Sequence, residues 1–323
     1  MGRNFYIFSN GTIRRKENTV FFETEKEKIP IPIEDIEQIF LFGEINLNTK
    51  FLNFMSQKGI VVHIFNYYGW YSGSFYPKEN LVSGVLLVKQ VQHYIDNSKR
   101  LFLASAFVDG AISNLKRNLE KRQNYEREIE KIKEFQTKIK EVSNITELMS
   151  IEAHVRKIYY SVWEKLTGWE FGEREIRPPK NPLNAMISFG NSLLYAQILK
   201  EIYETALNPT ISYLHEPQER RFSLALDIAE IFKPIFVDRL IFKLINNNQI
   251  TLNHFEQSLN FAYLNYEGRK IFVKEFDNFL NSTLKHRTLK RKVKYRSFIK
   301  LELYKLIKHL LGESKYKPLK VWW

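Results

Sequence analysis

The spacing of apolar residues along the chain changes once, near residue 80. Before this point, short runs rich in Ile, Val and Phe are separated by turn residues, a pattern typical of β-strands. After it, apolar positions follow the 3.6-residue period of amphipathic helices. Because 323 residues are also about twice the usual length of a domain, the sequence predicts an α+β protein of two domains. These are a β-rich domain over residues 1–80 and an all-α domain over residues 81–323.

Local signals place the elements within each domain. Strands are predicted at residues 5–9, 12–15, 20–23, 28–32, 36–41 and 60–65, with a short helix at 48–58. Asn10-Gly11 tolerates the positive φ of a tight turn, so the first two strands are predicted to form a hairpin. Helices are predicted at residues 81–109, 112–140, 146–166, 184–203, 217–232, 234–246, 269–284 and 290–311.

Several classes of site are excluded by what the sequence lacks. The chain has no cysteine, so it has no disulfide, thiolate metal site or thiol nucleophile, and only His, Asp and Glu remain as strong metal ligands. Glycine-rich nucleotide-binding loops and the HExxH and GxSxG motifs do not occur. No uncharged apolar run approaches the roughly 20 residues that cross a bilayer, and the N-terminus has no apolar signal core. We therefore expect a cytoplasmic protein without membrane contact.

Residues 217–234, which begin and end with proline, predict a buried helix with two acidic residues. Proline suits the first turn of a helix at one end and stops the helix at the other. At about 100° per residue, Asp227 and Glu230 share a narrow wedge, and apolar side chains occupy nearly all of the remaining circumference. Carboxylates taken out of water need cations, hydrogen bonds or a metal ion to offset the cost.

The helix predicted at 146–166 carries a third acidic residue on its apolar face. Glu152 lies at the centre of this face, and Arg156 follows one turn later. His154 lies on the opposite, polar face, so we expect it at the surface and exclude it as a metal ligand.

His215 is the best placed of the seven histidines. Pro217 biases the residue before it away from helix, so His215 lies in an extended segment that enters the carboxylate helix. Four side chains could therefore form a mixed oxygen and nitrogen site for Mg²⁺ or Mn²⁺, namely Glu152, His215 and Glu230, with Asp227 beside them.

Ion pairs are the alternative use of these carboxylates. Glu152 would then pair with Arg156, and Glu230 or Asp227 would pair with Arg220, Arg221 or Arg239. The spacing of the residues leaves both interpretations open.

Positive charge is concentrated at the end of the chain. The net charge is +13, and residues 284–323 hold thirteen basic and two acidic residues, so the rest of the chain is nearly neutral. A basic segment on a neutral body is typical of a surface that binds a polyanion, with nucleic acid as the first candidate. Trp322 and Trp323 end this segment and could dock on the core or on a partner.

Four blocks of sequence resemble a known family. They are IEA at residues 151–153, PLNA and SFG within residues 182–190, LHEPQERRFSLALDIAEIFKP at residues 214–234, and LNYEGRK at residues 264–270. In these blocks the chain resembles the metal-dependent DNA integrase and endonuclease of the CRISPR adaptation module, which acquires spacers. Together with the order of β and α structure, the resemblance extends over essentially the whole chain.

The resemblance implies a fold and a site. Family members have an N-terminal β domain that makes the homodimer and a helical catalytic domain that holds one divalent metal ion. The ligand positions fall on Glu152, His215 and Glu230, and Asp227 falls on an acidic position that assists the site. Tyr213 departs from the glycine that other members have before the Leu-His pair.

The resemblance also implies the reaction and its partners. A DNA 3′-hydroxyl attacks a phosphodiester, so that double-stranded prespacers are inserted into a CRISPR repeat, and a small ferredoxin-like adaptation protein bridges the homodimers. A divalent ion suits this chemistry. Phosphate contacts are expected from six basic residues: Arg287, Lys290, Arg291, Lys292, Lys294 and Arg296.

Two other functions remain open at this point. One is a metal-dependent nuclease that acts on branched DNA in repair, because cleavage and joining use the same kind of site. The other is an architectural DNA-binding protein without catalysis, whose carboxylates are ion-paired in the core.

Overall fold

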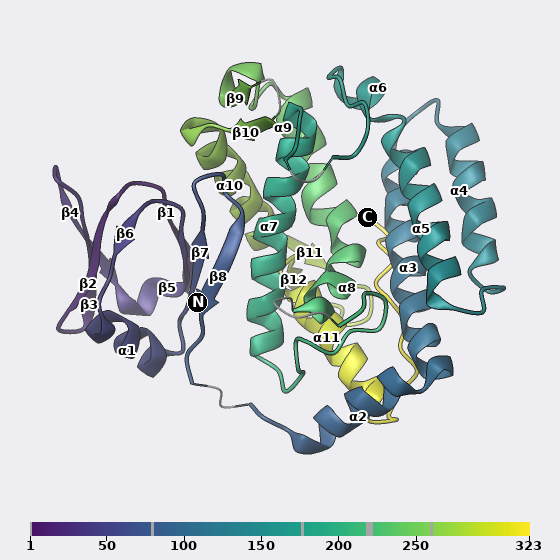
Figure 1. Cartoon of the computed structure of the whole chain (residues 1–323), viewed down its shortest axis with the longest axis horizontal. Coiled ribbons are helices and arrows are strands. Elements are labelled where there is room, and N and C mark those ends of the chain that lie inside the picture. Colours follow the sequence, from purple (N-terminus) through teal and green to yellow (C-terminus); the bar gives the residue numbers. More distant parts are fainter. Residues whose placement is uncertain (1, 79–80, 176–177, 218–221, 259–260) are drawn as a thin grey trace.

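Two β-sheets precede a body of helices in the computed structural model, which describes residues 2–78, 81–175, 178–217, 222–258 and 261–323 (Figure 1). The α+β prediction, with strands first and helices after, is therefore confirmed. The last strand of the sheets ends at Phe75, and the first helix of the body begins at Gly84. Residues 79–80 lie outside the described ranges, and the domain boundary at residue 80 stays a prediction.

The two sheets have four strands each and pack over a core of their own. The first sheet has the order β1-β5-β7-β8, formed by Arg3–Ile7, Ile36–Leu41, Val61–Phe65 and Tyr71–Phe75. The second has the order β4-β3-β2-β6, formed by Lys28–Pro32, Thr19–Glu23, Gly11–Lys16 and Ile45–Asn46. Helix α1 (Thr49–Lys58) contributes Phe51 and Met55 to this core, where they are fully buried with Ile13 and Val20.

The predicted hairpin of the first two strands is wrong. β1 pairs in parallel with β5, whereas β2 pairs with β3, so the strands on either side of Asn10 belong to different sheets. The Asn10 side chain instead accepts the N–H of Glu44 at 2.9 Å. A Cβ on Gly11 would lie 2.4 Å from the carbonyl oxygen of Glu23. Glycine is therefore needed here for the close approach of β3, and the turn signal was misleading.

The helical body is built around α7, which is buried on nearly all sides and has the sheets on one side and α3 and α5 on the other (Figure 1). Its helices are α2 (Gly84–Ile95), α3 (Asn97–Glu120), α4 (Glu126–Lys138), α5 (Ile145–Tyr160), α6 (Trp163–Thr167), α7 (Pro182–Tyr203), α8 (Ser223–Phe232), α9 (Arg239–Asn246), α10 (Tyr266–Asn281) and α11 (Ser297–Leu310). In the described ranges, no helix is both long and apolar enough to span a membrane.

Short elements complete the body and correct the expectation that it is all helix. Two hairpins join the helices, β9 with β10 (Phe255–Ser258 and Phe261–Leu264) and β11 with β12 (Thr283–Lys285 and Lys292–Lys294). A 3₁₀ turn also lies in the body at Leu252–His254, and another lies among the sheets at Ile33–Asp35, between β4 and β5.

Two predicted helix boundaries differ for identifiable reasons. The helix predicted at 81–109 is interrupted at Asp96, whose carboxylate caps α3 by accepting the N–H groups of Ser98 and Lys99 at 3.0 and 3.1 Å. Pro234 does not stop the carboxylate helix. The chain continues through a π-helical turn, Lys233–Asp238, and proline lies in the first turn of this segment.

Aromatic packing joins the sheets to the helical body. The ring of Phe42, directly after β5, lies 5.9 Å from the ring of Phe189 on α7. The next residue, Gly190, is required by close packing, because a Cβ there would lie 2.7 Å from Cγ1 of Val237 in the π-helical turn. The SFG block is thus explained by contact between α7 and the segment that follows α8.

The C-terminal tail folds back onto its own chain. The Asn114 side chain on α3 accepts the N–H of Val321 at 2.9 Å. The rings of Trp322 and Trp323 lie 6.0 and 5.1 Å from the ring of Phe298 on α11. The two tryptophans therefore dock on the core of the same chain.

Candidate active site

Helix α8 carries both acidic residues of the predicted wedge into the interior. Asp227 is fully buried and Glu230 is 5% exposed. The helix packs against α3 and α7, which explains why its apolar residues surround it almost completely. The predicted burial is correct, and the structure shows which contacts offset the cost of burying each carboxylate.

Asp227 is compensated by hydrogen bonds from the segment that precedes α8. One carboxylate oxygen accepts hydrogen bonds from the backbone N–H groups of Tyr213 and Leu214 at 2.6 and 3.0 Å. The other oxygen accepts hydrogen bonds from the backbone N–H of His215 at 3.0 Å and from Nδ1 of its ring at 2.8 Å. Because a carboxylate only accepts, Nδ1 carries the proton and Nε2 is the ring nitrogen left for a ligand. Asp227 thus fixes the tautomer and orientation of His215.

Glu230 is compensated by cations, one of which also binds Glu152. The Arg156 guanidinium on α5 donates through Nε to Glu152 and through Nη2 to Glu230. Lys233, one turn after Glu230, lies 2.5 Å from its other carboxylate oxygen. Two carboxylates from helices far apart in the sequence therefore meet at one guanidinium.

These contacts test part of the alternative interpretation, in which the carboxylates form ion pairs. Glu152 does pair with Arg156. Arg239, however, donates to the side chain of Asn118 at 2.7 Å and not to the wedge. Arg220 and Arg221 lie outside the described residues.

Burial and charge act against each other on the pKa values of the site. Burial alone would raise the pKa of Glu230, but Lys233, Arg156 and His215 outweigh it and lower this pKa to about 2. Burial alone would lower the pKa of His215, but its hydrogen bond and the charges of Asp227 and Glu230 raise it. The site therefore combines an anionic carboxylate with a polarised imidazole.

The donor set fits a hard divalent ion in its chemistry. Carboxylates with one imidazole suit Mg²⁺ or Mn²⁺, and Glu152, Glu230 and the free nitrogen of His215 supply them. In the described part of the chain, no three His, Asp or Glu side chains are placed closely enough to hold an ion as they stand, because Arg156 lies between the two glutamates. The ligand set stays a prediction. Both oxygens of Asp227 are already used, which favours a positioning role over ligation for this residue.

Two residues of this region were missed by the sequence analysis. Lys233 was detectable, because residues three apart on a helix are neighbours and it follows Glu230 at that spacing. Asp238 was not, because the helix was predicted to end at Pro234. It lies on the π-helical turn, where burial raises the pKa of its carboxyl to about 7 although Arg156 opposes this.

His154 lies where the sequence predicted it. Its side chain is exposed on α5, its Nδ1 is bonded to the carbonyl of Ser150 at 2.7 Å, and its ring stacks on Phe135. It takes no part in the site.

A family model described as CRISPR associated protein Cas1 matches residues 5–278 of this chain. The chain belongs to the Cas1 family. The resemblance drawn from the sequence blocks is thereby confirmed.

Cas1 relatives match the chain over its full length. The "CRISPR-associated endonuclease Cas1 2" of Moorella thermoacetica is 59% identical over 321 residues, which cover 99% of this chain and 100% of that protein. The structure of a CAS1 protein from Thermotoga maritima has 44% identity and a TM-score of 0.89, covering 98% of this chain and 100% of that one. A casposase bound to an integration product shares the fold at 21% identity, with a TM-score of 0.87 and coverage of 98% and 92%.

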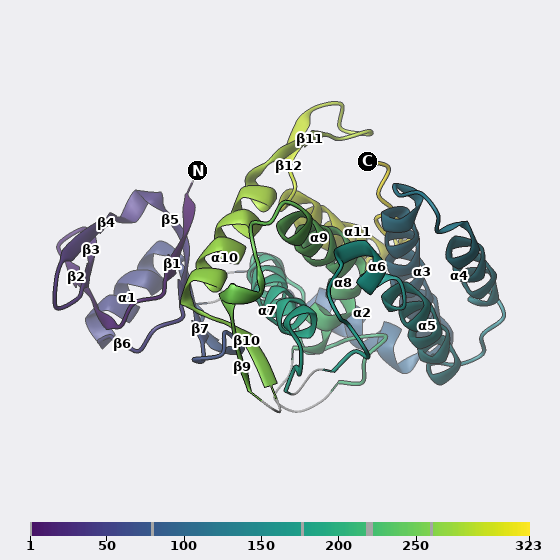
Figure 2. The ribbon, with the colours of Figure 1, turned by 90° about the horizontal axis from the view of Figure 1, so that it is seen from above.

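The basic segment of this Cas1 chain forms a hairpin where a helix was predicted. The helix predicted at 290–311 begins only at Ser297, and the β11–β12 hairpin before it extends along the top of the view in Figure 2. The ring of His286 in its turn stacks on Phe298 of α11. Four of the predicted DNA contacts are exposed on the hairpin and its turn: Arg287, Lys290, Arg291 and Lys292. Their contact with DNA stays a prediction.

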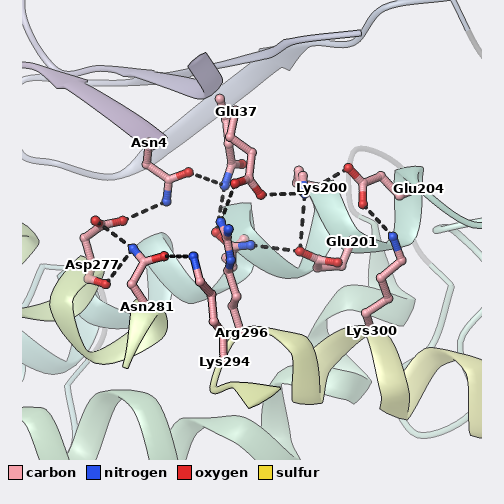
Figure 3. Close-up of polar contacts among 12 residues, drawn as sticks. Asn4, Glu37, Lys200, Glu201, Glu204, Asp277, Asn281, Lys294, Arg296 and Lys300 are labelled. Carbon is pink, nitrogen blue, oxygen red and sulfur yellow. Dashed lines mark hydrogen bonds and ion pairs between the residues drawn. The ribbon is translucent and has the colours of Figure 1, made fainter. Parts of the chain in front are cut away.

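Arg296 and Lys294 are placed differently. Arg296 is 5% exposed and its guanidinium pairs with Glu37 on β5, which also binds Lys200 at 3.0 Å (Figure 3). Lys294 is half-buried and donates to Asn281 at 3.2 Å. Arg296 therefore joins the sheets to the helical body, and we remove it from the proposed DNA surface. Sequence alone did not reveal this, because Glu37 is 259 residues away.

Two matched substitutions should separate these roles. Arg296→Ala breaks a buried ion pair and should lower the free energy of unfolding by about 2 kcal/mol, while Glu37 keeps Lys200 as a partner. Lys292→Ala removes an exposed charge, so it should leave stability unchanged and weaken DNA binding most at low salt. Urea denaturation and DNA titration of both variants check this. Equal stability of the two variants would contradict the structural role of Arg296.

Proposed function

We propose that this Cas1-family protein is a divalent-metal-dependent DNA endonuclease and integrase that inserts short double-stranded fragments into a CRISPR array. The convergence of Glu152 and Glu230 on one guanidinium, next to a histidine oriented by Asp227, is the observation that carries the proposal. It supplies oxygen and nitrogen donors from two helices and a loop at one place. Endonuclease is also the name given to the Moorella relative.

The residues of the site have separate tasks in this reaction. We infer that Glu152, His215 and Glu230 hold one Mg²⁺ or Mn²⁺ ion, which when bound polarises the phosphodiester and offsets the charge that develops on it. Asp227 keeps Nε2 of His215 free, and Lys233 adds positive charge beside Glu230. The reaction requires no covalent intermediate on a side chain of this set. The attacking group is then a water molecule in cleavage and a DNA 3′-hydroxyl in joining.

Partners follow from the family resemblance and from one exposed surface. We propose a homodimer made by the β domain, bridged by the small ferredoxin-like adaptation protein, acting on chromosomal DNA in the cytoplasm. Helix α2 adds a second candidate contact surface, because Val85, Val88 and Ile95 on it are 66%, 55% and 69% exposed. Large apolar side chains grouped in this way favour a protein contact.

Removal of the metal ion tests the proposal. Labelled duplex with a free 3′-hydroxyl should be joined to a plasmid that carries a repeat array when Mn²⁺ or Mg²⁺ is present, and not in EDTA. The same duplex with a 3′-dideoxy end should not be joined. Joining in EDTA would overturn the metal dependence, and cleavage without any joining would favour the repair nuclease.

Metal binding should also be visible without catalysis. A ligand at 100 times its Kd stabilises the folded state by about 2.7 kcal/mol, so saturating Mn²⁺ should raise the melting temperature of the metal-free protein by a few degrees. Glu230→Gln should show little of this rise. An unchanged melting temperature of the wild type would favour the architectural protein, whose carboxylates need no ion.

A further inference from the structure

A large groove lies on the helical body, between α3, α4, α11 and the C-terminal tail. Its volume is about 1390 Å³, which exceeds the roughly 300–1,000 Å³ of a small-molecule site. Its lining is mostly apolar and includes Phe102, Ala106 and Leu301. A groove of this size and shape accommodates a chain-like ligand.

Helix α3 separates this groove from the active site. Phe102, Ala106 and Asp109 line the groove, whereas the side chains of Asn114 and Asn118 donate to carbonyl groups at the end of α8 and just after it, at 3.0 and 2.8 Å. At about 100° per residue, the two sets lie on different faces of α3, about 130° apart on average. The groove is thus distinct from the site that α8 helps to form.

The lining of the groove carries positive charge that its own acids do not neutralise. Its acidic residues, Asp109 and Glu302, are each paired with a lysine of the lining, at 2.6 and 2.5 Å. Three other exposed lysines have no acidic partner in the described ranges, and each comes from a different wall: Lys140 after α4, Lys308 on α11 and Lys317 on the tail. A polyanion complements this lining.

The groove continues into the basic hairpin. The turn between β11 and β12 contributes Thr288 and Leu289 to the lining. The Arg287 guanidinium lies 5.0 Å from the centre of the Trp322 ring, at the edge of the groove. Figure 2 shows the hairpin and the C-terminus on the same side of the body. The hairpin and groove therefore form one continuous basic surface.

We propose that this groove binds a single strand of DNA, away from the reacting phosphodiester. A single strand carries a phosphate charge and a flat apolar base in every unit, which matches the exposed lysines and the mostly apolar lining of the groove. A duplex presents its phosphates outward and stacks its bases inside, so it offers no apolar surface to this lining. An extended peptide needs partners for its backbone, but the Gln136 amide of the lining is already bonded to Asp109 and Ser113 at 2.7 and 2.8 Å.

The proposal rests on the proposed function only in taking DNA as the polyanion. Its test is therefore done in EDTA, where no catalysis occurs. Fluorescence anisotropy of labelled oligo(dT) of about 15 nucleotides is measured for the wild type and for two triple variants. One replaces Lys140, Lys308 and Lys317 with Gln. The other replaces three exposed lysines outside the groove, for the same change in charge: Lys16, Lys50 and Lys157.

The groove variant should bind oligo(dT) at least about tenfold more weakly than the wild type. The slope of log K against log salt concentration should also become shallower by about two, because each phosphate contact of a single strand contributes about 0.7 to this slope. The control variant and Glu230→Gln should bind like the wild type. As the chain has no cysteine, a dye on Thr288→Cys should also respond to oligo(dT).

Three results would overturn the proposal. Equal weakening of both triple variants would show that only net charge matters. Tighter binding by Glu230→Gln, which removes a negative charge from the active site, would place the strand there and would leave the proposed metal-dependent function untouched. Competition by polyglutamate as effective as by oligo(dT) would assign the groove to an acidic protein segment.

Discussion

Replacing Glu230 with alanine should abolish divalent-dependent joining of DNA ends and leave DNA binding in EDTA nearly unchanged. Glu230 is 5% exposed, and Lys233, Arg156 and His215 hold its pKa well below the ordinary value, so the carboxylate is anionic at neutral pH. The side chain thus keeps its negative charge although burial disfavours the charged form. Such a charge is well suited to bind a divalent ion, and alanine removes it.

The neighbouring substitutions sharpen this expectation. Glu152→Ala and His215→Ala should give the same loss of joining if the three side chains hold one ion. Glu170→Ala, at an exposed acidic residue outside the site, is the matched control and should join at the wild-type rate. The measurement is a gel assay of labelled 3′-hydroxyl duplex with Mn²⁺.

Folding has to be separated from chemistry in these variants. Glu230→Ala leaves Arg156 and Lys233 without this carboxylate, so its melting temperature is measured beside that of Glu230→Gln, which keeps the shape of the side chain. Joining at the wild-type rate by a folded Glu230→Ala protein would remove the proposed metal site.

The acidic wedge of α8 shows how much of the site can be predicted from the sequence. The helical period correctly placed Asp227 and Glu230 inside the protein, because burial of an apolar helix is a local property. The two carboxylates nevertheless have different partners. One faces the loop before its own helix and the other faces α5, and the period of a single helix carries no information about which segments pack around it.

Long-range pairing limits the prediction elsewhere in the same way. The turn signal of Asn10-Gly11 is a local preference. Pairing of the first strand with β5 stabilises the fold more than a hairpin would, because the side chains of β5 complete the core. Arg296 lies in a run of basic residues that is typical of a DNA surface, yet its partner Glu37 is far away in the sequence. In both cases tertiary contacts override a local pattern.

Asp227→Asn should impair both stability and metal binding, although Asp227 is not a proposed ligand. An asparagine side chain replaces one accepting oxygen with an NH₂ donor, which then faces N–H groups of residues 213–215. Buried donors left without acceptors should cost about 2–4 kcal/mol. The free energy of unfolding in urea measures this loss, and Asp35→Asn, at a half-exposed surface aspartate, is the control.

The effect on the metal site has a different signature. Without the Asp227 carboxylate, His215 loses the partner that fixes its Nδ1 proton, and loss of such a partner typically weakens metal affinity about 10–100-fold. Asp227→Asn should therefore need more Mn²⁺ for half-maximal joining, but should recover activity at high Mn²⁺, which Glu230→Ala should not. Failure to recover would instead indicate that Asp227 binds the ion directly.

The pH dependence of stability in EDTA gives an independent test of the same contact. The folded protein raises the pKa of His215 above its ordinary value of 6.5, so the folded state binds this proton more tightly than the unfolded state does. The resulting stabilisation is complete below pH 6.5 and is lost as the pH rises through the raised pKa. In Asp227→Asn this loss should shrink, because the hydrogen bond and the charge of Asp227 no longer raise the pKa of His215 and only the charge of Glu230 remains. A wild-type stability that does not fall over this range would show that the hydrogen bond leaves the imidazole neutral.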